Sequence, residues 1–252
     1  MIELFSYELS HSDLWMILSV SVLIGMSKTG VHGAGMIAVP LLAAVFGGKQ
    51  SSGFLLPILC LADIFGVVYY HRHAAWDHLW KLFPWAAAGT LLGTWVGNYI
   101  DDEAFKLIMA IIIFISVGLM IWLEKRKKNE EKVPAYFWFA ALMGVAGGFT
   151  SMVGNLAGSV MALYLLSVHL PKNSFIGTAA WFFMVLNWFK LPFHIFSWHT
   201  ITVDSFLFDL VTLPAIGLGA LIGVAIIKKI PEKQYRWFII AMTVVAAFGM
   251  LL

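Results

Sequence analysis

Long apolar runs follow one another along almost the whole chain, and they leave little room for anything but a membrane protein. Of the 252 residues, 61% are hydrophobic and only 12% are charged, which is about half the charged fraction of a soluble domain. Several runs are long enough to cross a hydrocarbon core of roughly 30 Å. The longest polar stretch, Glu124–Lys132, is too short to form a soluble domain. We therefore predict an all-α, polytopic membrane protein.

The apolar segments form two groups, one on each side of that polar stretch. They are Leu14–Met26, Val31–Phe46, Ser52–Tyr70, Leu82–Tyr99 and Phe105–Leu123, then Ala135–Phe149, Val153–Val168, Ser174–Phe193, Ser205–Ile227 and Tyr235–Leu252. The first two segments of each group are short, so each pair is expected either to span as two helices or to re-enter as one hairpin. With three spanning helices after each pair, the chain has roughly 8 to 10 membrane segments.

Two stretches rich in glycine and polar residues interrupt the apolar runs at matching places. Gly25–Gly35 contains a lysine and a histidine, and Gly148–Gly158 is a weaker repeat 123 residues later, in which the first and last glycines match. Charge inside a membrane is costly, and glycines break helices there. One broken segment in each half is typical of the binding site of a secondary transporter.

The two halves repeat in sequence beyond these breaks. An offset of 123 places Gly25, Gly35, Lys49 and His71 on Gly148, Gly158, Lys172 and His194, and an offset of 130 places Pro84, Gly89 and Gly93 on Pro214, Gly219 and Gly223. Each half makes an odd number of crossings, so the two copies are expected to be inverted. We divide the chain into a first transmembrane repeat (1–123), a charged cytoplasmic linker (124–133) and a second repeat (134–252).

Basic residues set the expected orientation. If the N-terminus is outside, twelve Lys and Arg residues lie inside, two (Lys49 and Lys106) lie outside, and Lys28 and Lys190 lie within apolar segments. This bias predicts a multi-pass protein of the inner (plasma) membrane with both termini outside. Met1–Asp13 is acidic and lacks a basic start, so it is not expected to be a cleaved signal peptide.

The two breaks are expected to meet near the bilayer midplane as one anion site. Helix N-termini and the amides of flexible glycines favour anions, Lys28 adds a full positive charge, and neither break contains an acid. The candidate substrate-binding residues are Lys28, Thr29, Gly30, His32, Gly33, Gly35, Ser151, Gly154, Asn155 and Gly158. The alternatives are that the glycines only allow close helix packing and that Lys28 extends to the interface.

Three further polar residues within apolar segments are candidates for proton coupling or gating. Asp63 is expected either to pair with Lys28, to carry a coupling proton, or to be a structural, hydrogen-bonded acid. Asn187 lies next to the equivalent position in the second half. Lys190 is expected either to line an outer exit path or to extend to the interface beside Trp188 and Trp198.

The sequence gives little support to other functional classes. Cys60 is the only cysteine, and His71, His73 and His78 have no carboxylate cluster beside them, so we predict neither a metal site nor a cofactor. Neither a metalloprotease motif nor a nucleophile-elbow motif is present, which argues against an intramembrane enzyme. An anion channel stays open as an alternative. No nucleic-acid partner is expected, and the oligomeric state is open between a monomer and a homodimer.

The chain resembles the TauE/SafE-type sulfite exporters, the TSUP anion permeases, over nearly its whole length. The resemblance rests on Gly25-Met-Ser27-Lys28-Thr-Gly30, Pro40-Leu-Leu-Ala43, Gly148–Asn155, Met161–Leu166 and Gly177–Phe183. Many members continue the first break with Phe-Gly-Gly-Gly, where this chain has Val31-His32-Gly33-Ala34, so His32 is expected to alter substrate choice or to add a titrating group. The resemblance implies export of sulfite or organosulfonates, driven by proton or ion gradients.

Overall fold

A computed structural model describes residues 2–4, 7–101 and 137–249, with scattered positions between 103 and 118. The predicted linker 124–133 and most of the predicted segment Phe105–Leu123 lie outside the described residues. The described chain begins with an antiparallel hairpin of β1 (Ile2–Leu4) and β2 (Tyr7–Leu9), in which Ile2 pairs with Leu9. The prediction of an all-helical fold is right for the rest of the described chain but lacks this hairpin.

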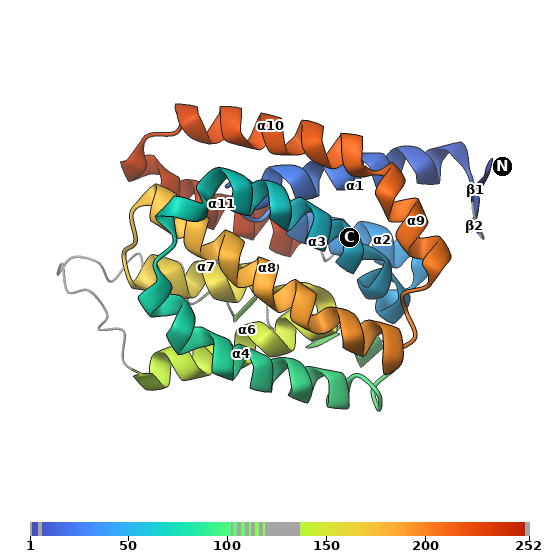
Figure 1. Cartoon of the computed structure of the whole chain (residues 1–252), viewed down its shortest axis with the longest axis horizontal. Helices are drawn as coiled ribbons and strands as arrows, with labels where there is room; N and C mark the ends of the chain where they lie inside the picture. The colour runs from blue at the N-terminus through green and yellow to red at the C-terminus, as the bar shows by residue number, and fades with distance from the viewer. Residues whose placement is uncertain are drawn as a thin grey trace.

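The helices lie side by side in one bundle, with α10 and α4 on opposite edges (Figure 1). Their bounds are α1 His11–Lys28, α2 Ala34–Phe46, α3 Gly48–Tyr70, the 3₁₀ turn η1 His71–His73, α4 Trp76–Val96, α6 Phe137–Gly154, α7 Ala157–Ser167, α8 Lys172–Phe196, α9 Val203–Val211, α10 Leu213–Lys229 and α11 Glu232–Gly249. The N-terminal end of α1 carries a capping box in which Ser10 and Asp13 exchange hydrogen bonds.

Several helices have the length and composition of membrane spans. Lys49–His73, Phe137–Gly154 and Lys172–Phe196 each qualify on their own, and α9 and α10 qualify together as a pair bent by 49°. Large apolar side chains on α4 and α10, such as Trp95 and Leu221, are exposed on the outside of the bundle. Such apolar surfaces can contact lipid, because the hydrocarbon core offers no hydrogen-bond partners that polar side chains would need.

Both glycine-rich stretches interrupt helices. The first break runs from Thr29 to Gly33, where Gly30 and Gly33 have φ angles of 121° and 96° that side chains rarely adopt. The second break consists of Asn155 and Leu156, and Asn155 has a φ of 55°. Asparagine tolerates this left-handed region better than most residues. The chain therefore reverses twice at short, conformationally special turns.

The prediction of one continuous helix is wrong for one of the segments. Ser205–Ile227 divides at Thr212 into α9 and α10. Pro214 at the start of α10 has no N–H to give to the last turn of α9. The hydroxyl of Thr212 instead donates to the carbonyl oxygen of Asp209, at 2.7 Å. These two features end α9 and let α10 start in a new direction.

Two close helix crossings hold the bundle together. A Cβ added to Gly25 in α1 would overlap the carbonyl oxygen of Ile216 in α10, and a Cβ added to Gly148 in α6 would overlap that of Ala86 in α4. Gly25 corresponds to Gly148 under the offset of 123, and Ala86 corresponds to Ile216 under the offset of 130. For these two glycines, close helix packing is the right interpretation.

Lys49 and Lys172, which correspond under the offset of 123, each contact the C-terminal end of a helix. The Lys49 ammonium donates to the carbonyl oxygen of Gly97 after α4, at 2.9 Å, and that of Lys172 donates to the carbonyl oxygens of Ile227 in the last turn of α10 and Ile230 just after it, at 3.3 and 2.7 Å. Both lysines satisfy carbonyl groups that the helix leaves unpaired and favour the negative end of its dipole. The two halves are thus built from matching contacts.

Candidate functional site

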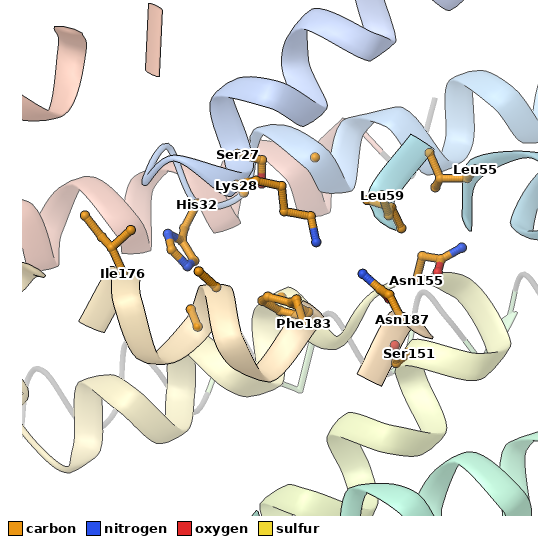
Figure 2. Close-up of a pocket in the computed structure, with 15 residues that line it drawn as sticks. Ser27, Lys28, His32, Leu55, Leu59, Ser151, Asn155, Ile176, Phe183 and Asn187 are labelled. Carbon is orange, nitrogen blue, oxygen red and sulfur yellow. The ribbon is translucent and has the colours of Figure 1, made fainter. Parts of the chain in front are cut away.

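One pocket lies between the two breaks and takes residues from both of them. Figure 2 shows the Lys28 and Asn187 side chains pointing toward one another across this space, with Asn155 and Ser151 beside it. The lining residues are Ser27, Lys28, His32, Gly33, Gly35, Leu55, Leu59, Ser151, Asn155, Gly158, Ile176, Ala179, Ala180, Phe183 and Asn187. The pocket therefore draws on α1, α3, α6 and α8 as well as on the starts of α2 and α7.

Lys28 supplies the positive charge of this pocket. It is the last residue of α1, where the negative end of the helix dipole favours a cation. Its side chain is 9% exposed, and its Nζ lies 2.7 Å from Oδ1 of the fully buried Asp63 and 4.4 Å from the ring centre of Phe183. Lys28 is thus held inside the bundle, and the alternative that it extends to the interface does not describe it.

Asp63 is bound from both sides. Its Oδ1 pairs with Lys28, and its Oδ2 accepts a hydrogen bond of 2.6 Å from the amide of Asn187 in α8. Two of the three candidate coupling or gating residues therefore meet across α3 and α8. Of the roles considered for Asp63, the ion pair with Lys28 is the one present in this conformation. Asp63, which lies outside both glycine-rich stretches, thus balances the positive charge of Lys28.

Lys190 holds Asn155 in place in the part of the pocket wall that the second break contributes. The Lys190 ammonium is fully buried and donates to Oδ1 of Asn155 at 2.7 Å and to the carbonyl oxygen of Ser151 at 3.0 Å. The Asn155 amide nitrogen donates in turn to Oγ and the carbonyl oxygen of Ser52, both at 3.1 Å. Lys190 does not line the pocket. It binds Ser151 and Asn155, which do line the pocket, and it does not reach the membrane interface.

His32 closes the end of the pocket next to the first break. Its side chain is buried, and its ring stands edge-on to Phe175 with the ring centres 4.9 Å apart. Its Nδ1 lies 3.3 Å from the carbonyl oxygen of Gly30, and the Tyr235 hydroxyl donates to the same oxygen at 2.9 Å. This arrangement connects the break to α11 and holds the imidazole against the pocket.

Three of the ten candidate binding residues are used elsewhere. The hydroxyl of Thr29 donates to the carbonyl oxygens of Gly25 and Ala220, each at 3.1 Å, and so joins α1 to α10. Gly30 forms the turn and packs against Ile176. Gly154 is buried at the end of α6. The remaining seven all line the pocket: Lys28, His32, Gly33, Gly35, Ser151, Asn155 and Gly158.

The apolar part of the wall could not be identified from the sequence. Ile176, Ala179, Ala180, Phe183 and Asn187 lie on one face of α8, because they recur every three or four residues. Ser52, Leu55, Leu59 and Asp63 recur in the same way along α3. This spacing was visible in the sequence, but within wholly apolar helices it does not show which face borders a cavity.

The pocket combines a cation and neutral hydrogen-bonding groups on one side with apolar side chains on the other. The polar side has the Lys28 ammonium, the Ser27 and Ser151 hydroxyls and the Asn155 and Asn187 amides. Amides and hydroxyls donate as well as accept, so they can adapt to the oxygens of a small anion. Asp63, the carboxylate paired with Lys28, is buried behind the lining and does not border the cavity.

Comparison with known protein families identifies a match over nearly the whole chain. The family model described as "Sulfite exporter TauE/SafE" matches residues 17–250, which is nearly the whole chain. No curated protein and no solved structure matches the chain.

Proposed function

Because the chain belongs to the sulfite exporter TauE/SafE family, we propose that it is a secondary transporter that exports a small sulfur-containing anion such as sulfite or an organosulfonate. The observation that carries this proposal is a pocket lined by residues of both breaks, in which the Lys28 ammonium and the Asn187 amide point toward one another and Ser151 and Asn155 complete the wall. A site at which broken helices meet is where secondary transporters bind their substrates.

The anion binds on the polar side of the pocket and competes with Asp63 for Lys28. In this structure the Lys28 ammonium pairs with the carboxylate at 2.7 Å. A carboxylate that takes up a proton loses its hold on an ammonium, and Lys28 then becomes available for the anion. Binding of one proton and one anion together keeps the buried charge low, which matters because unbalanced charge is costly inside a bilayer.

This coupling is compatible with export. A dianion such as sulfite that moves with one proton carries one net negative charge, and a membrane potential that is negative inside drives such a charge outward. A sulfonate monoanion that moves with one proton is electroneutral, and its direction follows the combined gradients of the two. The carrier therefore needs no source of energy other than ion and substrate gradients.

Alternating access follows from an inverted pair of repeats, 1–123 and 134–252, on either side of the cytoplasmic linker 124–133. This proposal is supported by the matching glycine crossings, Gly25 on Ile216 and Gly148 on Ala86, and by the matching helix-end contacts of Lys49 and Lys172. Inverted repeats place a site at their interface and let one repeat move against the other. The placement of the basic residues supports an inner-membrane protein with both termini outside.

The test uses purified protein in liposomes. Uptake of sulfite, sulfate, thiosulfate and an alkyl sulfonate is measured side by side, with and without an imposed pH gradient. A coupled carrier saturates with at least one sulfur anion and accelerates under the pH gradient. Uptake that neither saturates nor responds to the gradient would instead identify an anion channel.

A further inference from the structure

Asp209 is a second buried acid, and the pocket does not use it. It lies in the last turn of α9, three residues before the bend at Thr212, and its side chain is fully buried. Neither of its carboxyl oxygens has a hydrogen-bond partner within the described chain. Asp63, by contrast, is held by Lys28 and Asn187. The two buried acids therefore have opposite environments.

The surroundings of Asp209 contain almost no charge. α9 packs against α3 and α10. The titratable groups of α3 that lie toward its middle are Cys60, which is near enough to Asp209 to interact with it electrostatically, and Asp63, which is paired. The only charged groups of α10, Lys228 and Lys229, are exposed at its other end. No described cation is therefore in place to balance a carboxylate at Asp209.

An isolated carboxylate in such a place is far more costly than the neutral acid. Apolar sites can keep a carboxylic acid neutral at pH 7 for this reason. Acids that bind and release protons are a recurring functional element of membrane transporters. A bend between two half-helices is also a place where transporters change shape and bind coupling ions.

We propose that Asp209 is a second proton-binding site, which holds a proton in this conformation and exchanges it when the bend between α9 and α10 opens to water. The geometry that carries this inference is a fully buried, unpartnered carboxyl beside a 49° bend. The inference deepens the proposed function, since it adds a proton to the transport cycle beyond the one at Asp63. With this second proton a dianion such as sulfite moves without net charge, so its export follows the combined gradients of anion and protons instead of the membrane potential.

Infrared spectroscopy of the purified protein in lipid tests the proton directly. The C=O stretch of a protonated carboxyl is recorded at neutral pH for the wild type, Asp209→Asn and, as a matched control, Asp63→Asn. The band is expected in the wild type and in Asp63→Asn and absent in Asp209→Asn. In D₂O it should shift, because the proton exchanges. A band that Asp209→Asn does not change, or that resists D₂O, would overturn the proposal.

Proton and anion fluxes in liposomes test the role in transport. Asp209→Asn should lower the number of protons moved per sulfite by one, and Asp209→Glu, which keeps an ionisable group, should restore it. An unchanged ratio in Asp209→Asn contradicts the second site. If the wild type moves no sulfur anion, the proposed function fails, and the infrared band and its exchange in D₂O still decide the case for Asp209.

Discussion

The Lys28 ammonium and the Asp63 carboxylate lie 2.7 Å apart, in a buried ion pair between the end of α1 and the middle of α3. In the proposed cycle, the anion must therefore compete with this carboxylate for the Lys28 ammonium. The second contact of Asp63, from the Asn187 amide, is expected to keep the acid in position when Lys28 binds the anion. The following predictions depend on this arrangement and on the contacts around it.

Removing Lys28 alone should destabilise the protein. Lys28→Met leaves the Asp63 carboxylate buried without its counter-charge, and breaking one side of a buried pair costs about 3–5 kcal/mol. The double variant Lys28→Met, Asp63→Leu should recover most of that loss, because it removes both charges. Thermal unfolding in detergent measures both variants, and equal loss in the two would show that the ion pair has no structural importance.

Asp63→Asn should bind the anion more tightly than the wild type. The amide leaves Lys28 unpaired and available, and about a tenfold gain in affinity corresponds to roughly 1.4 kcal/mol of competition removed. Binding should also lose most of its dependence on pH, since the competing acid is gone. Titration calorimetry at several pH values measures both effects. Weaker binding with unchanged pH dependence contradicts the competition between anion and carboxylate.

Gly25→Ala and Gly148→Ala should each destabilise the bundle by about 1–3 kcal/mol or more, the usual cost of an overpacked site. In each case the new methyl group meets a backbone carbonyl of another helix, which cannot move aside like a side chain. Gly217→Ala in α10 is the matched control, because its nearest neighbours are ring atoms of Phe65 at 3.8 Å. Similar unfolding temperatures for all three variants would contradict the close crossings.

Lys190→Met should weaken anion binding by about tenfold, which is roughly 1.4 kcal/mol. The change removes the hydrogen bonds that fix Asn155 and the backbone of Ser151 in the pocket wall. Lys172→Met is the control: it removes a helix-end contact whose partners do not line the pocket, so it should lower stability by about 0.5–1.5 kcal/mol and leave affinity unchanged. If the two variants bound the anion with equal affinity, Lys190 would have no role in positioning the anion site.

Much of the fold could be predicted from local signals. Long apolar runs identify membrane helices, and the glycines, the lysine and the histidine of Gly25–Gly35 mark a break that apolar residues alone would not form. The bend at Thr212 was missed because Pro214 is compatible with a helix that starts there as well as with one that is kinked. The hairpin at Ile2–Leu9 was missed because Ile2-Glu3-Leu4 and Tyr7-Glu8-Leu9, although each alternates, are too short for alternation to indicate a strand.

The site was predictable only in part, for a different reason. Polar residues in apolar segments point to a pocket by themselves, so Lys28, Ser151 and Asn155 were identifiable. Their partners depend on which helix faces pack together. Asp63 was expected to pair, to be protonated or to be structural, and only the tertiary arrangement selects the ion pair. Asp209 carries the same signal as Asp63, an acid within an apolar segment, but its lack of partners is a property of the packed bundle.

The most direct test of the anion site is sulfite binding to the wild type, to Lys28→Arg and to the double variant Lys28→Met, Asp63→Leu, each checked for folding by thermal unfolding. We predict saturable binding to the wild type, binding within about tenfold for Lys28→Arg, which keeps the charge, and none for the folded double variant. Undiminished sulfite binding by the folded double variant would contradict the assignment of Lys28 as the residue that binds the anion.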